Sequence, residues 1–84
     1  MPEEEIGRVE GYFAHVGVAA IQLSGTLRVG DTVHIRGHTT DLLQMVESME
    51  IDRQPVSEAG AGADVGIRVK ERVRGGDHVY RITP

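Results

Sequence analysis

The 84-residue sequence has no cysteine and no tryptophan, and its aromatic residues are two tyrosines and one phenylalanine. Without cysteine the chain can form neither a disulfide framework nor a thiolate metal site, which fits a reducing cytoplasm. With so few aromatic residues, the interior must be built from Val, Ile, Leu, Met and Ala. A domain of this size buries only about 60–65% of its unfolded surface. We therefore expect one small aliphatic domain located in the cytoplasm.

Two further absences exclude classes of function. No apolar run approaches the roughly 20 residues of a membrane-spanning helix, so we expect no membrane association. Lys70 is the single lysine, and the Gly-Lys-Ser/Thr end of a phosphate-binding loop does not occur. Because that loop cradles the phosphates of a nucleotide with its backbone amides, this sequence excludes hydrolysis of GTP by a phosphate loop.

The net charge of −4 is unevenly distributed along the chain. Glu3, Glu4 and Glu5 supply three of the acidic side chains, and we predict that residues 1–5 form a disordered acidic terminus. The window from Arg68 to Arg81 holds five basic and two acidic side chains. Charge is therefore polarised, with the basic residues concentrated towards the end of the chain.

One turn signature, glycine followed by aspartate, occurs three times before residues that alternate between apolar and polar. The three copies are Gly30-Asp31, Gly62-Ala63-Asp64 and Gly76-Asp77. Glycine tolerates the positive φ of tight turns, and aspartate can hydrogen-bond to backbone close to its own position. Alternation with a period of two predicts half-buried strands after each turn.

The pattern predicts short strands separated by turns along nearly the whole chain. The clearest segments are residues 6–13, 16–23, 32–36, 65–73 and 78–82. Residues 42–51 are ambiguous, because Leu42, Met45, Val46 and Met49 have helical spacing and Thr40 or Asp41 could cap a helix.

The neighbouring short strands favour a strand in this ambiguous segment. Six or seven strands then predict an all-β fold, a small closed antiparallel β-barrel over residues 6–84. Closure would remove the exposed edges that an open sheet of this size leaves.

The order of several short motifs resembles domain II of the translational GTPases, the class of elongation factor Tu and the initiation factors. The motifs are Leu27-x-Val29-Gly30-Asp31-x-Val33-x-Ile35, Val46-x-Ser48-Met49-x-Ile51, Ala59-Gly60 with Val65-Gly66-Ile67, and Gly76-Asp77-x-Val79. In that family the segment is a small closed β-barrel that packs on the GTPase domain and helps to contact tRNA or the ribosome. The chain also resembles, through the same type of barrel, a C-terminal appendage of collagenase-type peptidases.

The sequence predicts no catalytic residue, no metal ligand and no cofactor. His34 and His38 are four residues apart, which is about 13 Å along a strand, whereas ligands must converge on one ion. Asp31, Asp64 and Asp77 each have a structural role in a turn. Because no nucleophile, base and oxyanion donors can be grouped, we predict that the chain is not an enzyme.

The segment 67–74 is the best functional candidate, because basic residues alternate there with aliphatic ones. We predict that one strand face binds nucleic acid through Arg68, Lys70, Arg72 and Arg74. The alternative is a solvated face whose cations pair with Glu47, Glu50 and Asp52 on a neighbouring strand. A bulge at Glu71 would interrupt the row.

Two hypotheses for function follow. The first is a non-catalytic, translation-factor-like binding module that contacts RNA or a protein associated with the ribosome. The second is a structural or accessory barrel that forms homo-oligomers or docks on a separately encoded enzyme, such as a collagenase-type peptidase, through an apolar patch.

Overall fold

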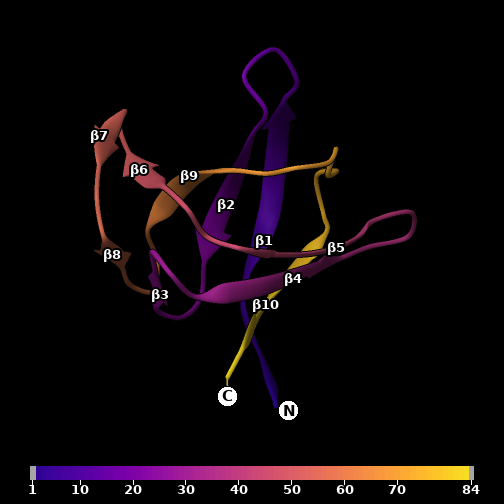
Figure 1. The fold of residues 1–84 in the computed structure, drawn as a ribbon, viewed down its shortest axis with the longest axis horizontal. Coiled ribbons are helices and arrows are strands. Elements are labelled where there is room, and N and C mark those ends of the chain that lie inside the picture. The colour runs from indigo at the N-terminus through magenta and orange to yellow at the C-terminus, as the bar shows by residue number, and fades with distance from the viewer. Residues whose placement is uncertain (1, 84) are drawn as a thin grey trace.

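The computed structural model describes residues 2–83, and within them the chain forms ten β-strands and no helix (Figure 1). The strands are β1 (Glu3–Phe13), β2 (Val18–Leu23), β3 (Leu27–Arg28), β4 (Thr32–Arg36), β5 (Asp41–Met45), β6 (Met49–Ile51), β7 (Gln54–Pro55), β8 (Glu58–Ala59), β9 (Asp64–Arg68) and β10 (His78–Ile82). The prediction of an all-β fold is confirmed. The count exceeds six or seven because β3, β7 and β8 are two residues long and because residues 42–51 belong to two strands.

Eight strands form one antiparallel sheet in the order β5-β4-β10-β1-β2-β9-β6-β7, and β3 pairs with β8 in a second sheet. The sheet bends around one core, and the two chain ends run side by side in β1 and β10 (Figure 1). The end strands β5 and β7 are not paired with each other, so strand pairing does not close the sheet into a barrel.

The inner face of the sheet carries the aliphatic residues that alternation predicted. The largest fully buried side chains are Ile6, Val9, Ile21, Leu27, Val33, Ile35, Val46, Ile67, Val73 and Val79. They come from six strands and from two connections, so a single cluster holds the whole molecule together.

Strand β1 begins at Glu3, three residues before the predicted start. Glu3 to Glu5 pair with Ile82 to Tyr80 of β10, and their carboxylates contact His34, Arg81 and His78. The predicted disorder is therefore wrong for residues 3–5, because a partner strand from the other end of the chain holds them. Met1 lies outside the described residues.

Strand β9 ends at Arg68 and does not continue to Val73 as predicted. Its partner β2 begins at Val18, which pairs with Arg68, so no further residue of β2 is left to extend the ladder. After one more bond, from the Val69 N–H to the Gly17 carbonyl at 2.9 Å, residues 69–77 form an irregular connection to β10.

A side-chain amide bridges the gap between β5 and this connection. The Gln44 Nε2 donates to the Arg68 carbonyl at 2.9 Å, and the Lys70 N–H donates to Gln44 Oε1 at 2.9 Å. Gln44 points inward with Leu42 and is 5% exposed. It therefore satisfies two backbone groups that have no partner strand at this point.

No helix between residues 2 and 83 is long and apolar enough to cross a membrane.

Candidate binding surfaces

Two of the three glycine–aspartate signatures form the same turn. In residues 28–31 and 74–77 the fourth N–H donates to the first carbonyl at 3.1 Å, and Gly30 and Gly76 have φ of 99° and 94°. The aspartate carboxylates accept from the Arg28 N–H at 2.9 Å and the Arg74 N–H at 2.8 Å. Asp31 and Asp77 therefore have the predicted structural role.

The third signature differs in its aspartate. Its turn runs from Gly60 to Ala63, whose N–H donates to the Gly60 carbonyl at 3.2 Å, and Gly62 has a φ of 90°. Asp64 follows this turn as the first residue of β9 and is exposed. The predicted turn is present, but the Asp64 carboxylate is available for another role.

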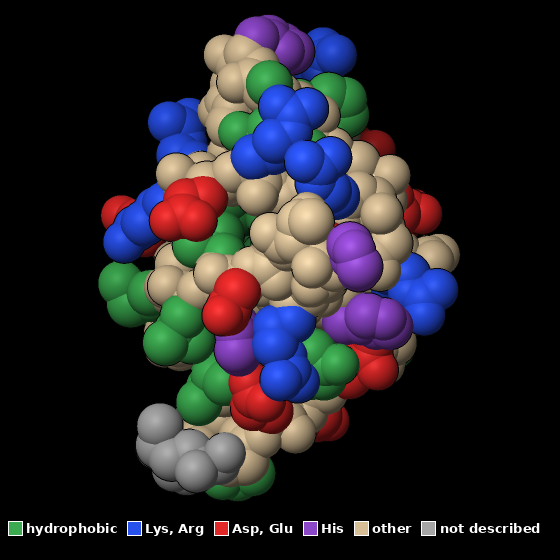
Figure 2. All heavy atoms as spheres, turned by 90° about the vertical axis from the view of Figure 1, so that its right-hand side faces the viewer, with side chains coloured by type: hydrophobic (Ala, Val, Ile, Leu, Met, Phe, Trp, Pro, Cys, Tyr) green, Lys and Arg blue, Asp and Glu red, His purple; other side chains and the backbone are tan. Residues whose placement is uncertain are grey.

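The four predicted nucleic-acid-binding residues do not lie on one regular strand. Arg68 ends β9, whereas Lys70, Arg72 and Arg74 lie on the connection that follows. All four are exposed while Val69 and Val73 are buried, and exposed Glu71 interrupts the alternation in a segment that forms no strand. We call these four cations the basic connection. Figure 2 faces the side of the molecule where this connection runs and shows Lys and Arg side chains clustered near the upper centre.

The cations of the chain differ in whether a carboxylate contacts them, and within residues 2–83 Arg8 and Arg53 share with the basic connection the lack of such a contact. Arg28, Arg36 and Arg81 each contact a glutamate, at 2.6, 3.5 and 2.6 Å. Within residues 2–83, the four cations of the basic connection have no carboxylate within 4.0 Å, so the predicted pairing with Glu47, Glu50 and Asp52 is not formed. The Arg72 guanidinium instead lies 5.6 Å from the centroid of the Tyr12 ring, and Arg74 Nε donates to Thr39 Oγ1 at 2.9 Å.

His34 of β4 joins three strands. The ring of His34 contacts Glu3 Oε1 of β1 through Nδ1 at 2.8 Å and Asp41 Oδ1 of β5 through Nε2 at 2.5 Å. Hydrogen bonds to Asp41 and then to Glu3 raise the pKa of His34 above its usual value. His38 is exposed in the turn between β4 and β5, so the two histidines do not converge on a common point.

Strand β5 presents apolar side chains on its outer as well as its inner face. Leu43 and Met45 are 63% and 51% exposed, whereas Leu42 and Gln44 point into the core. Beside them is a hollow of about 610 Å³, whose lining includes Leu43, Ile82 and His34. We call Leu43 and Met45 the β5 apolar face, which pattern reasoning missed because residues 42–51 had no assigned phase.

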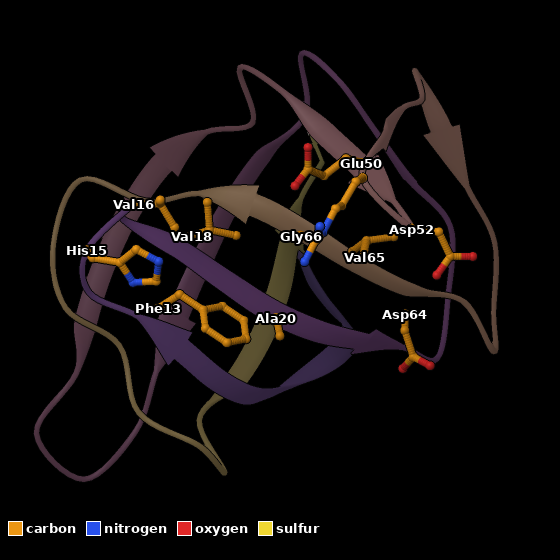
Figure 3. Close-up of a pocket in the computed structure, with 11 residues that line it drawn as sticks. Phe13, His15, Val16, Val18, Ala20, Glu50, Asp52, Asp64, Val65 and Gly66 are labelled. Atoms are coloured by element: carbon orange, nitrogen blue, oxygen red, sulfur yellow. The ribbon is translucent and has the colours of Figure 1, made fainter.

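A second hollow lies on the outer face of β2, β9 and β6 and was also missed. It has a volume of about 680 Å³. Figure 3 shows Phe13, Val16 and Val18 towards one end, and Asp52 and Asp64 towards the other. Phe13 at this hollow is 51% exposed. A bulge between Val9 and Gly11 inserts one residue in β1, so Tyr12 faces the core and Phe13 faces outward.

Comparison with known proteins found no matching family model. The chain is 43% identical over 77 residues to an uncharacterized protease of Methanocaldococcus jannaschii, and 40% identical over 78 residues to a collagenase of Porphyromonas gingivalis. Each match covers 90% of this chain but only 19% and 22% of the relative. The chain thus spans about a fifth of the length of the curated relatives it matches.

Among solved structures, the C-terminal domain of a putative U32 peptidase from Geobacillus thermoleovorans has a TM-score of 0.88 at 23% identity, covering 95% of this chain and 93% of that domain. GDP-bound aIF5B from Aeropyrum pernix has a TM-score of 0.65 at 18% identity, covering 95% of this chain and 15% of that protein. The likeness to a translational GTPase is therefore confirmed for the fold alone.

These findings correct the predicted function. The relatives that match at 40% identity or more are named as a protease and a collagenase, and the solved domain that covers nearly all of this chain comes from a peptidase. The hypothesis of a translation-factor module is therefore wrong, and the alternative that links the chain to a collagenase-type peptidase is favoured. The same comparison contradicts the prediction that the chain is not an enzyme, because the relatives, of which the chain spans about a fifth, are named as a protease and a collagenase.

Proposed function

We propose that this chain is a β-barrel domain of a collagenase-type peptidase and that it docks on the catalytic part of that enzyme. The observation that carries the proposal is the identity of 43% over 90% of the chain to a protease roughly five times as long. In such a relative, most of the polypeptide lies outside the match and supplies a surface on which the domain can pack.

Closure of the barrel belongs to the same proposal. Strand pairing leaves β5 and the end of β9 apart, and the Gln44 amide spans the gap with two hydrogen bonds of 2.9 Å. A side chain that pairs with backbone on the far side of the gap replaces a missing ladder bond, and so makes the sheet continuous around the core.

The β5 apolar face is the docking surface in this proposal. Leu43 and Met45 lie on an end strand of the sheet, more than half exposed, next to the hollow that Ile82 lines. Covering these side chains with the catalytic part removes apolar surface from water, which is the main favourable term in protein association.

The test replaces the matching segment of the full-length Porphyromonas gingivalis collagenase with this chain and measures cleavage of gelatin. We expect the chimera to remain active, and Leu43→Asp with Met45→Asp to lower activity by more than about tenfold, because charge is then buried at an apolar contact. Val29→Asp, at a residue 41% exposed elsewhere, is the matched control and should change activity little.

Either of two results would contradict the proposal. One is a chimera that folds, as judged by circular dichroism, but has no activity. The other is a double variant as active as the unsubstituted chimera, which would show that the β5 apolar face touches nothing that matters for the enzyme.

A further inference from the structure

The hollow on the outer face of β2, β9 and β6 is longer than one cavity. A second cavity of about 330 Å³ shares four lining residues with the larger one, namely Val16, Val18, Glu50 and Gly66. The two therefore form one continuous trough across neighbouring strands, which we call the β2–β9 groove. Its elongated shape suits an extended chain better than a compact small molecule.

The floor of the groove is low because small residues are paired there. Ala20 of β2 lies opposite Gly66 of β9 in the antiparallel register. A Cβ on Gly66 would approach the Val18 Cγ1 to 3.2 Å and the Glu50 Cγ to 3.5 Å. A larger residue at this position would therefore fill the groove between its two walls.

One end of the β2–β9 groove is mainly apolar. Phe13, the last residue of β1, and Val16, in the turn to β2, are 51% and 47% exposed, and Val18 and the imidazole of His15 lie beside them (Figure 3). The β1 bulge directs Phe13 outward, where about half of its surface is exposed. An aromatic and a branched aliphatic residue left in water beside a hollow are typical of a binding surface.

The other end of the β2–β9 groove is acidic. Asp52 and Asp64 line it (Figure 3), and in the part of the chain from 2 to 83 neither has a basic partner within 4.0 Å. Glu50 lies between the two ends, and Arg53 and Arg68 also line the groove, so three carboxylates face two guanidinium groups along its length. Desolvation and the neighbouring Asp64 carboxylate raise the pKa of Glu10, which adds a further acidic group beside Asp64.

We propose that the β2–β9 groove binds an extended polypeptide segment in which an apolar side chain lies close to a lysine or arginine. The apolar side chain packs against Phe13 and Val16, and the cation lies among the carboxylates of Asp52 and Asp64. The acidic end disfavours a nucleic acid, whose phosphates it would repel. Neither residue of the β5 apolar face lines the groove, so this proposal does not depend on docking to a catalytic part.

Fluorescence anisotropy with the full chain tests the proposal. The probe is a labelled octapeptide of alternating leucine and lysine, and two further peptides replace all leucines by serine or all lysines by glutamate. We expect only the leucine–lysine peptide to bind with a dissociation constant below about 1 mM. Phe13→Ser should weaken binding about tenfold, since it removes most of the apolar wall.

A charge variant tests the other end of the groove. Asp52→Asn with Asp64→Asn should weaken binding about fivefold at low salt, because two attractive contacts with the lysines of the peptide are lost. Asparagine tolerates the positive φ of 50° at residue 52 as aspartate does, so the turn is retained. The matched control, Glu47→Gln with Glu71→Gln, removes two exposed charges that do not line the groove.

Each other result overturns the proposal. Equal affinity for the glutamate peptide, or no effect of Phe13→Ser, shows that the peptide binds elsewhere or without selectivity. Binding of a single-stranded RNA that Phe13→Ser abolishes assigns the groove to nucleic acid. Dimerisation in analytical ultracentrifugation that the same variant abolishes assigns the groove to a second copy of the chain.

Discussion

Asp31 and Asp77 make the same two contacts in the same kind of turn, but they differ in their surroundings. Asp77 is 5% exposed and packs against Gly37, where a Cβ would collide with its carboxylate. Asp31 is only half-buried. When a buried hydrogen bond is lost, water cannot replace the acceptor, so the donor is left unsatisfied. Comparing the two positions therefore separates the stability that the turn hydrogen bond itself contributes from the additional contribution of its burial.

We expect Asp77→Ala to lower the free energy of unfolding by about 2 kcal/mol and Asp31→Ala by about 0.5–1 kcal/mol. Both variants lose the bond to the arginine N–H three residues earlier, but only the first leaves that N–H in a partly buried site. Urea unfolding followed by circular dichroism measures both. Equal losses would show that burial of the Asp77 turn adds nothing.

A second prediction at the level of single residues concerns the basic connection, which remains a predicted nucleic-acid-binding surface. Its four cations are exposed and, among the described residues, have no carboxylate partner. They are therefore free to contact phosphates, and each such contact releases counterions from the nucleic acid. Exposed Glu71 and the irregular backbone are the features that oppose a regular row.

We expect a fluorescent single-stranded RNA to bind at low salt and to dissociate as salt rises. Arg72→Glu with Arg74→Glu should weaken this binding at least about tenfold, because two phosphate contacts become repulsive. Arg8→Glu, on β1, is the control of like charge. If the wild-type chain shows no binding even at low salt, the prediction for these residues is wrong.

At the scale of the strand, the hydrogen-bonded ladder explains what local pattern could not. Residues 42–51 satisfy a helical spacing as well as a strand pattern, and only pairing of β5 with β4 and of β6 with β9 makes them strands. Likewise Val69 and Val73 still face the core after the partner strand has ended. Alternation reports which side chains face the core, whereas a strand also needs a neighbour to bond to.

Gln44 is where this distinction can be measured. Gln44→Leu keeps the volume but removes the partners of the Arg68 carbonyl and the Lys70 N–H, so we expect a loss of about 3 kcal/mol in unfolding free energy. Hydrogen exchange at Lys70 should accelerate in the same variant. Gln22→Leu, at an exposed residue of β2, should change stability by no more than about 0.5 kcal/mol, and a similar small effect at Gln44 would refute its role in closure.

At the scale of the whole molecule, charged side chains tie the two ends of the chain to its middle. His34 contacts Glu3 of β1 and Asp41 of β5, and Arg81 of β10 contacts Glu4 and the Thr26 carbonyl. Arg81 therefore holds the two ends of the chain together and is not part of the basic connection. Because the first and last strands meet here, the global stability of the domain should respond to the charge of His34.

The pKa of His34 is raised in the folded state, so protonation favours folding. This contribution is complete below the ordinary histidine value of about 6.5 and is lost as pH rises through the raised folded value. We expect the unfolding free energy to fall over that window in the wild type and to be flatter in His34→Gln. His38→Gln is the control, and a wild-type profile identical to that of His34→Gln would contradict the assignment.

The sequence by itself determined the all-β class, most strand positions and the two aspartate turns, because alternation and turn chemistry act between residues close in the chain. Only the tertiary structure decided that Glu3 to Glu5 join β1, that β9 stops at Arg68 and that Gln44 spans the gap beyond it. It also decided that a bulge turns Phe13 outward to one end of a groove whose other end is acidic. These features depend on pairing and contact between residues distant in the chain, which no local pattern encodes.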